Sequence, residues 1–516
     1  MSSIERFYGV PAAASSDFPQ KPLLVNNLSI QFMKEAKFIP ARLADNELTV
    51  IMSNPLDFYA LDAIRLATGH ELRVLYGREE GVLLAIEQHY GSGVSSMEKI
   101  IEDIDSASTY KGEDEESIDH LRDMASEGPV IRLVNLIITR AIETRESDIH
   151  FEPFEDLFRV RYRIDGVLHD VESMPKRLQA AIISRVKIMA KMNIAERRLP
   201  QDGRIMLRVR GKEIDFRVST VPTIHGESIV LRILDKGSIV LDVEKLGFPE
   251  DTLEGFRELI ERPHGIILVT GPTGSGKTTT LYCALEKINS PEKKIITVED
   301  PVEYQLRGIN QIQVKPQIGL SFANALRSIV RQDPDVILIG EIRDAETAEI
   351  AIQSALTGHL VLSTLHTNDA PSAITRLVDM GMEDYLLSST IIGILAQRLV
   401  RVACPHCRFP SVPDPAILRE MRLEKEDLSG FQISQVKGCE NCSQTGYWGR
   451  QGIFEFFKIT EEIQGLILGK KDSNIIKEVA RKQGMRTLRE DGWLKVKQGI
   501  TTIPEVLRVT QEEEVL

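Results

Sequence analysis

Residues 271–278 read Gly-Pro-Thr-Gly-Ser-Gly-Lys-Thr and match the phosphate-binding loop pattern G-x-x-x-x-G-K-[ST] without a mismatch. The glycines let the backbone turn several N–H groups inward, and the N-terminus of a following helix adds partial positive charge. In this pattern Lys277 reaches the β- and γ-phosphates of a nucleotide, and the Thr278 hydroxyl ligates Mg²⁺. We therefore expect ATP and Mg²⁺ to bind here. The expected nucleotide-binding residues are Gly271, Pro272, Thr273, Gly274, Ser275, Gly276, Lys277, Thr278 and Thr279.

Such a loop needs an acidic group that helps to hold the metal and directs water. The apolar run 336–339 is followed by Gly340 and Glu341, which is typical of a buried strand that ends in a catalytic carboxylate. We expect Glu341 to lie one strand over from the loop, within reach of the metal or its water shell. The alternative interpretation is a surface carboxylate at a strand end.

A second acidic group follows the strand-like run 294–298. Glu299, Asp300 and Glu303 place three carboxylates within five residues. Their mutual repulsion is expected to raise the pKa of at least one of them, which favours proton acceptance. Either Glu299 or Glu303 is thus a candidate general base for an attacking water, and the alternative is a solvated acidic turn.

Two histidines, His359 and His366, bracket a third strand-like run, 360–365, which also contains Thr364. An imidazole near a γ-phosphate can sense that group through a hydrogen bond. A lone histidine is more often a packed core residue, but two histidines around a strand beside the loop favour a functional role for this pair.

Three arginines could stabilise charge on a reacting phosphoryl group. Arg327 and Arg331 are four residues apart on an expected helix and share a face, and Arg343 follows Glu341 by two. An arginine supplied by a neighbouring subunit is worth about 10³–10⁵ in kcat where it has been tested. The pattern leaves open which arginine reaches which site.

Four of the five cysteines form two C-x-x-C pairs. They are Cys404, Cys407, Cys439 and Cys442. Two such knuckles complete a tetrahedral S₄ shell that suits Zn²⁺ and leaves no open position, so the expected zinc site is structural. His406 is a weaker alternative ligand, and a dithiol redox centre is the alternative function. Cys283, on the helix after the loop, is expected to pack as a small apolar group in a reducing compartment.

The elements that position these groups alternate along the chain. From 243 to 400, short apolar strands such as 265–270 alternate with helical runs such as 278–288, which predicts a mostly parallel, helix-covered α/β sheet. A Cys-rich insert follows at about 401–450, and helical runs continue to residue 516. The segment 386–400 is very apolar but is broken by polar residues that include Gln397 and Arg398.

Residues 128–242 form a second expected domain of α+β type. A helix is predicted at 129–144, and the segment 158–164 alternates apolar residues with arginine, so that Arg159, Arg161 and Arg163 share one strand face. Asp165-Gly166 signals a hairpin turn. A second hairpin is predicted from Arg204 to Leu234. It carries Arg217 and Arg232, which either lie on a solvated face or reach a phosphate or a neighbouring subunit.

The N-terminal part, residues 1–100, is expected to be a small α/β module with a loose lead-in over 1–30. A strand at 48–52 and helices at 58–67 and from 82 indicate this class. Its simplest interpretation is a docking or spacer module without chemistry. Residues 101–127 are rich in Asp and Glu, which predicts a solvated linker.

The overall composition limits the function classes. The 516 residues suggest about three domains, and 42% hydrophobic with 27% charged residues is typical of a globular chain. The net charge of −13 argues against a general nucleic-acid coat. We find no signal peptide and no apolar run of membrane-spanning length, which predicts a cytosolic protein with at most peripheral membrane contact.

The chain resembles the secretion ATPase superfamily through four motifs, which occur in that family's order. Residues 271–278 match its Walker A motif, 299–303 its Asp box, 335–344 its Walker B motif and 357–368 its His box, with no departure inside the four boxes. Residues 147–153, Ser-Asp-Ile-His-Phe-Glu-Pro, match the entry to its second domain. The match spans about residues 130 to 516. The tetracysteine insert and the short first module resemble the type II secretion, or GspE-like, group.

This resemblance implies a hexameric ring of RecA-like domains that bind ATP against the preceding arginine-bearing domain. The family's Asp-box glutamate maps to Glu303 or Glu299, and its Walker B glutamate maps to Glu341. Arg217, Arg232, Arg327, Arg331 and Arg343 match arginines that contact nucleotide or adjacent subunits, and His366 lies in the His box.

For partners, the family implies that the first module docks on the cytoplasmic part of an inner-membrane protein, so that ATP hydrolysis drives assembly of a pilin-like filament. A type IV pilus extension ATPase is the closest alternative. A nucleic-acid motor and a scaffold that binds ATP without cleaving it are alternatives from other classes.

Overall fold

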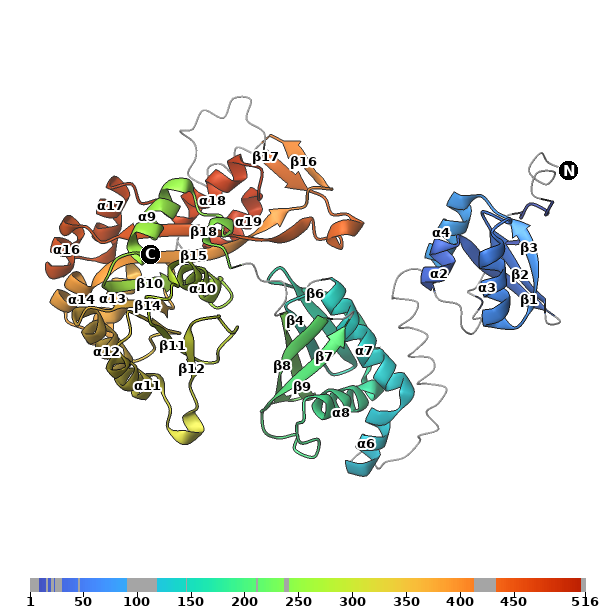
Figure 1. Cartoon of the computed structure of the whole chain (residues 1–516), viewed down its shortest axis with the longest axis horizontal. Helices are drawn as coiled ribbons and strands as arrows, with labels where there is room; N and C mark the ends of the chain where they lie inside the picture. The colour runs from blue at the N-terminus through green and yellow to red at the C-terminus, as the bar shows by residue number, and fades with distance from the viewer. Residues whose placement is uncertain are drawn as a thin grey trace.

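A computed structural model of the protein describes residues 9–14, 17–19, 23, 30–44, 47–90, 118–144, 146–209, 212–235, 241–412 and 433–511. Within these residues the chain forms three units, each built around its own sheet, which follow one another from blue to red in Figure 1. None of the helices in the described part of the chain combines the length and the apolar character that a bilayer span requires.

The first unit contains a three-stranded sheet in the order β1-β2-β3. Its elements are α2 (Ile30–Glu35), β1 (Phe38–Ala44), β2 (Glu47–Met52), α3 (Phe58–Thr68), β3 (Glu71–Tyr76) and α4 (Glu79–Tyr90). The backbone N–H of Ala60 donates to the Asp57 carboxylate at 3.0 Å, which caps α3 at its N-terminus. The predicted strand and both predicted helices are therefore confirmed. Most of the predicted loose lead-in lies outside the described residues.

The acidic segment 101–127 differs from its prediction. Residues 101–117 lie outside the described residues, but α6 (Ile118–Ser126) is a helix. Leu121 and Ala125 are 2% and 0% exposed because they are four residues apart and face the same neighbouring helices. The prediction of a solvated linker is therefore wrong for 118–126, where a narrow apolar stripe outweighs the acidic composition.

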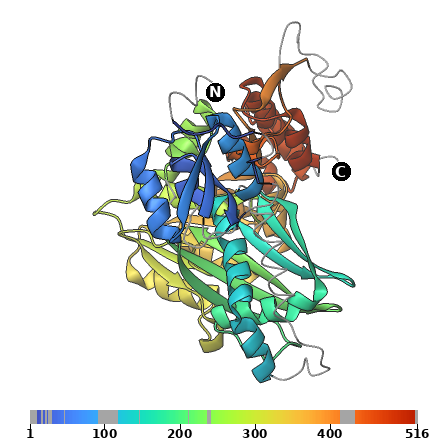
Figure 2. The same cartoon turned by 90° about the vertical axis from the view of Figure 1, so that its right-hand side faces the viewer.

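The second unit is an antiparallel six-stranded sheet in the order β6-β5-β4-β9-β8-β7. Its strands are β4 (Asp148–Pro153), β5 (Leu157–Ile164), β6 (Val167–Pro175), β7 (Gln201–Val209), β8 (Lys212–Thr223) and β9 (Gly226–Asp235). Helices α7 (Gly128–Glu143) and α8 (Gln179–Met189) contribute to its core, and Figures 1 and 2 both draw the helical segment beside the sheet.

The alternation predicted for 158–164 is confirmed. Phe158, Val160 and Tyr162 are at most 2% exposed, and the Tyr162 hydroxyl donates to the Ile137 carbonyl of α7 at 2.6 Å. Asp165 and Gly166 have φ values of 47° and 88° and form the predicted turn. The predicted second hairpin is in fact two consecutive hairpins, because β7, β8 and β9 pair in series.

The third unit is a seven-stranded sheet in the order β12-β11-β13-β14-β10-β15-β18. Its strands are β10 (Gly265–Thr270), β11 (Ile295–Glu299), β12 (Asn310–Gln313), β13 (Val336–Ile339), β14 (Leu360–Leu365), β15 (Ile391–Ala403) and β18 (Tyr447–Lys458). The pairs are parallel except β15–β18. The predicted α/β class is confirmed. However, β14 separates β10 from β13, so the prediction that Glu341 lies one strand over from the loop is wrong.

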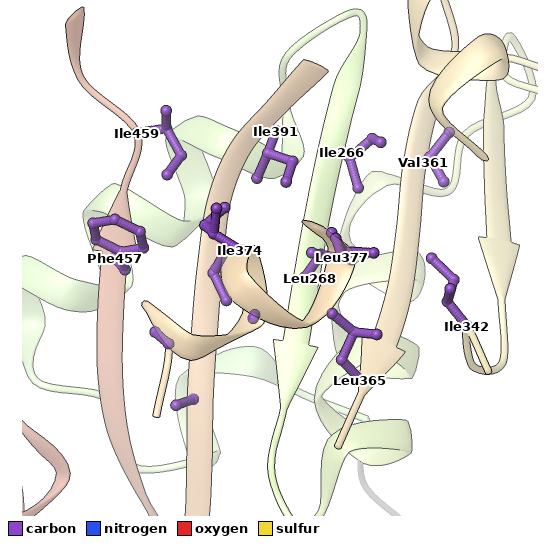
Figure 3. Packing of buried hydrophobic residues seen from close by; sticks show 14 of the residues in the cluster. Ile266, Leu268, Ile342, Val361, Leu365, Ile374, Leu377, Ile391, Phe457 and Ile459 are labelled. Atoms are coloured by element: carbon purple, nitrogen blue, oxygen red, sulfur yellow. The ribbon is translucent and has the colours of Figure 1, made fainter. Parts of the chain in front are cut away.

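Helices accompany this sheet along the chain. They are α9 (Glu250–Ile260), α10 (Lys277–Ile288), α11 (Phe322–Ile329), α12 (Ala345–Leu356), α13 (Ser372–Asp379), α14 (Asp384–Thr390), α16 (Glu461–Leu468), α17 (Ser473–Lys482), α18 (Leu488–Lys497) and α19 (Ile503–Thr510). Figure 3 shows Ile374 and Leu377 of α13 close to Leu268 of β10 in the apolar core. This packing holds the carboxyl end of β10, where the loop begins.

The Cys-rich insert leaves the sheet after β15 and returns at β18. Its two short strands, β16 (Arg408–Ser411) and β17 (Ile433–Val436), pair with each other in antiparallel fashion. Residues 413–432, in the middle of the insert, lie outside the described residues.

Candidate functional site

The loop at 271–276 connects β10 to α10 at the carboxyl end of the sheet. Gly271, Gly274 and Gly276 have φ values of 147°, 81° and 88°, which side-chain-bearing residues rarely adopt. The predicted order of strand, loop and helix is confirmed, with the helix beginning at Lys277 rather than Thr278. The geometry is that of an anion cradle at a helix N-terminus.

Lys277 lies inside this cradle and is 9% exposed. Its ammonium donates to the carbonyls of Gly271 at 2.7 Å and Pro272 at 3.0 Å. Burial lowers the pKa of Lys277 to about 8, and the positive charge of Arg398 adds to this effect while Glu341 opposes it. A phosphate would supply the negative charge that this buried ammonium lacks.

The remaining loop residues differ in exposure. Pro272, Thr273, Gly274 and Thr278 are exposed, and Thr279 is half-buried. Ser275 is 4% exposed, and its hydroxyl has no hydrogen-bond partner among the described residues. A buried donor without a partner, next to glycines in positive-φ conformations, fits a loop that takes a phosphate ligand.

Glu341 and His366 meet at the ends of neighbouring strands, β13 and β14. His366 Nε2 lies 3.3 Å from one Glu341 carboxylate oxygen, and an Arg343 nitrogen lies 2.5 Å from the other. Burial favours the neutral acid, but hydrogen bonds from Arg343 and His366 outweigh it and lower the pKa of Glu341. This carboxylate is thus held ionised, as a metal ligand must be.

His359 has a different position from His366. Its Nδ1 lies 2.7 Å from the Ser354 carbonyl oxygen and 3.1 Å from Thr357 Oγ1, just before β14 begins. The loop lies at the opposite end of the parallel strands β10 and β14. The six-residue strand β14 thus separates His359 from the loop. The predicted functional role of His359 is therefore wrong.

Each of the three Asp-box carboxylates has a different environment, so the prediction of a mutually repelling cluster does not describe them. Glu299 is 3% exposed and accepts hydrogen bonds from the hydroxyls of Tyr282 and Thr297. The Gln311 amide donates to the same carboxylate at 3.2 Å. Asp300 is exposed. Glu299 therefore joins α10, β11 and β12.

Glu303 instead faces the second unit. Its carboxylate lies 3.4 Å from an Arg217 nitrogen on β8, and Arg217 also donates to the Val302 carbonyl at 3.2 Å. Both side chains are partly exposed, at 30% and 22%. Sequence reasoning did not pair these two residues, because the contact depends on how two separately folded units meet.

The other arginines pair locally. Arg232 Nε lies 2.9 Å from the Asp148 carboxylate within the six-stranded sheet. Arg327 contacts the Glu346 carboxylate, and Arg331 donates to the Arg327 carbonyl. Arg343 pairs with Glu341 as described above. Of these arginines, only Arg343 contacts a residue of the nucleotide-binding edge in the described chain.

The four cysteine sulfurs lie within 4.8 Å of one another. The separations are 3.9 Å for Cys404–Cys439 and for Cys407–Cys442, and 3.6 Å for Cys439–Cys442. A tetrahedral shell with metal–sulfur bonds of about 2.3 Å needs sulfur separations of about 3.8 Å, so the four thiols fit a Zn²⁺ ion. His406 is exposed and does not belong to this group.

The thiols have different surroundings, and burial raises the pKa of Cys404 and of Cys407, in the second case to about 11. Burial opposes ionisation of Cys442, but backbone N–H groups of Cys439 and Gly446, each 3.2 Å from its sulfur, lower the pKa of Cys442 to about 7. Cys283 is 1% exposed in α10, and burial raises the pKa of its thiol to about 11, as expected for a packed, inert cysteine.

Comparisons with known proteins place the chain. The family model described as "Type II/IV secretion system protein" matches residues 123–508, and the MshEN domain model matches residues 8–96. The chain belongs to the type II/IV secretion system protein family. The predicted RecA-like fold is confirmed by a solved structure. The Legionella pneumophila ATPase DotB superposes with a TM-score of 0.54 at 21% identity, and the match covers 74% of this chain and 96% of that one.

Three relatives extend over most of the chain. The type II secretion system protein E of Xanthomonas campestris is 56% identical and covers 98% of this chain and 88% of its own. The type IV pilus assembly ATPase PilB of Myxococcus xanthus is 45% identical, covering 98% and 89%. The type II secretion system ATPase E of Vibrio cholerae is 44% identical, covering 89% and 91%.

Proposed function

We propose that this protein is the ATPase that powers type II protein secretion by driving assembly of a pilin-like filament. The observation that carries this proposal is the 56% identity to a type II secretion protein E along 98% of the chain, against 45% to a pilus assembly ATPase over the same length. The loop around Lys277 and the carboxylate of Glu341 supply the parts that ATP hydrolysis needs.

The chain's own residues have distinct roles in this reaction. The loop N–H groups and Lys277 bind the phosphates, while Thr278 and Glu341 hold Mg²⁺. The metal neutralises charge on the phosphates when bound. His366, hydrogen-bonded to Glu341, reports occupancy of the γ-phosphate position. The positions of these side chains at the carboxyl ends of β10, β13 and β14 support the assignments.

For the general base we favour Glu303 over Glu299. Three neighbouring donors occupy the Glu299 carboxylate, which is 3% exposed and therefore poorly placed to accept a proton from water. Glu303 is partly exposed, and its carboxylate pairs with the guanidinium of Arg217. Arg217 in turn can stabilise the negative charge that develops on the phosphoryl group.

We infer a homo-hexamer in which exposed arginines contact the adjacent subunit. Arg232, Arg327 and Arg343 have exposed fractions of 56%, 51% and 68%. Arg331 is also exposed. In a closed ring each of these cations can reach a nucleotide or an acidic group of a neighbouring copy.

The zinc site is structural in this proposal. Cys404, Cys407, Cys439 and Cys442 provide four ligands, which fills a tetrahedral shell and leaves no position for substrate. Zinc binding of this kind contributes roughly 10–16 kcal/mol to folding, enough to hold an insert with little apolar core.

The N-terminal unit docks on the cytoplasmic part of an inner-membrane platform protein, so the motor works at the cytoplasmic face of that membrane. Support comes from the MshEN match over residues 8–96, which lie outside the ATPase match. No nucleic acid is expected as a partner because the net charge is −13.

Two measurements test this function. Purified protein with Mg²⁺ and ATP should release phosphate, and Lys277→Ala should abolish release while the thermal unfolding midpoint stays unchanged. In the second, the gene should restore protein export to a strain that lacks its type II secretion ATPase, and it should not restore pili to a strain that lacks the pilus-extension ATPase. Restoration of pili alone would overturn the secretion assignment.

A further inference from the structure

Gln397 lies beneath the phosphate-binding loop, although it is more than 100 residues away in the chain. It is 2% exposed on β15, and its position follows from strand pairing. Thr270, the last residue of β10, pairs with Ala396, so Gln397 is level with Gly271, where the loop begins. β15 thus extends past the end of β10 and forms a floor under the loop.

The Gln397 amide makes two hydrogen bonds to the segment above it. Its Nε2 donates to the Ser275 carbonyl at 2.8 Å, and its Oε1 accepts from the Thr280 hydroxyl at 2.7 Å. One side chain therefore links the loop to the first turn of α10. The amide can make both bonds only in one orientation, because only Nε2 donates and only Oε1 accepts.

Gln397 also lies so close to two glycines of the loop that neither could carry a side chain without a clash. A Cβ atom at Gly276 would lie 2.8 Å from Gln397 Nε2, and one at Gly271 would lie 2.5 Å from the Gln397 carbonyl oxygen. The loop therefore rests directly on this residue. Glycine is needed at both positions for the loop to approach β15 this closely.

Peptide geometry connects this contact to phosphate binding. In a planar trans peptide, the carbonyl of one residue and the N–H of the next point in opposite directions. Because the Ser275 carbonyl is held toward Gln397, the Gly276 N–H is turned away from β15. That direction is the side of the loop on which an anion is received.

We propose that Gln397 is a positioning residue for nucleotide binding, which orients the Ser275–Gly276 peptide so that the Gly276 N–H donates to a phosphate. The inference rests on the proposed nucleotide-binding role of the loop. It predicts that the donor at position 397, rather than its bulk, sets the affinity for nucleotides that place a phosphate in the loop.

Gln397→Glu tests the donor directly, since a carboxylate of the same shape accepts from Thr280 but cannot donate to the Ser275 carbonyl. Titration with fluorescently labelled ADP should give about tenfold to hundredfold weaker binding for this variant near pH 8. Thr280→Val is the matched control: it removes the other hydrogen bond of the same amide and should change affinity by less than about threefold. Gln397→Met, which removes both bonds without adding charge, should weaken binding like Gln397→Glu.

A pH series separates positioning from a purely structural role. As the pH falls, the introduced carboxyl takes up a proton and becomes a donor again. The ADP affinity of Gln397→Glu, expressed relative to the wild type at the same pH, should therefore recover. Affinity within about twofold of wild type in both Gln397 variants, or no recovery at low pH, would overturn the inference. Failure of the wild type to bind ADP would instead contradict the proposed function.

Discussion

Arg217 and Glu303 lie 3.4 Å apart although 86 residues separate them in the chain. Arg217 belongs to the six-stranded sheet of the second unit, and Glu303 follows β11 of the seven-stranded sheet of the third unit. This ion pair therefore joins two units. The loop that carries the candidate general base is therefore held partly from outside its own domain. Movement between the two units would change the surroundings of Glu303.

This relationship predicts energetic coupling between the two side chains in catalysis. Arg217→Ala and Glu303→Ala should each lower kcat, and the double variant should lose less than the product of the two losses. The expected coupling is about 0.5–3 kcal/mol, measured by steady-state ATPase assays in a double-mutant cycle. Arg159→Ala is the control, because Arg159 pairs with Asp170 inside its own sheet. Coupling of equal size between Arg159 and Glu303 would contradict the specific contact.

The contact between Arg343 and Glu341 predicts that Arg343 affects the pH dependence of catalysis. The Arg343 hydrogen bond helps to lower the pKa of Glu341 below its ordinary value of 4.5, so the wild-type carboxylate stays ionised as the pH falls toward that value. Arg343→Gln removes this contribution and raises the pKa, so the acid limb of the kcat/KM profile should move to higher pH. Arg257→Gln, which breaks a pair with Glu244, should leave the limb in place. An acid limb that is the same in all three proteins would show that Glu341 does not govern it.

The burial of Lys277 predicts that nucleotide binding weakens at alkaline pH. Since burial lowers its pKa to about 8, the ammonium is charged below this pH and loses its proton above it. Affinity for ADP should therefore decrease as the pH rises through about 8, whereas Lys277→Arg, which stays charged, should bind weakly but without this decrease. Isothermal titration between about pH 7 and pH 9.5 provides the measurement. A constant wild-type affinity across this range would contradict the prediction.

The cysteine site predicts a metal content and its determinants. Purified protein should contain about one zinc per chain, measured by atomic emission. Cys404→Ser or Cys442→Ser should lose most of the metal and lower the thermal unfolding midpoint, because bound zinc contributes to folding. His406→Ala and Cys283→Ser are controls that should keep it, since neither residue belongs to the four-sulfur group. Loss of zinc from His406→Ala would return that histidine to the ligand set.

The roles of the two Asp-box glutamates and the two histidines could not be separated from the sequence. Glu299 and Glu303 are four residues apart, yet one is buried among three donors and the other meets an arginine from a different unit. His359 and His366 bracket the same strand, yet they lie at its opposite ends. Burial and partners of such residues depend on segments that are distant in the chain, which a local pattern does not contain.

The sequence by itself determined the features whose chemistry lies within a few neighbouring residues. Three features are of this kind: the loop at 271–278, the two C-x-x-C pairs and the alternation of 158–164. Each depends on the backbone geometry and side-chain direction of residues that lie within two to eight positions of one another. Tertiary structure alone decided the strand order that puts β14 between the loop and Glu341, and the placement of Gln397 under the loop. Both arise from burying apolar strands against distant partners, and that packing is a property of the whole folded chain.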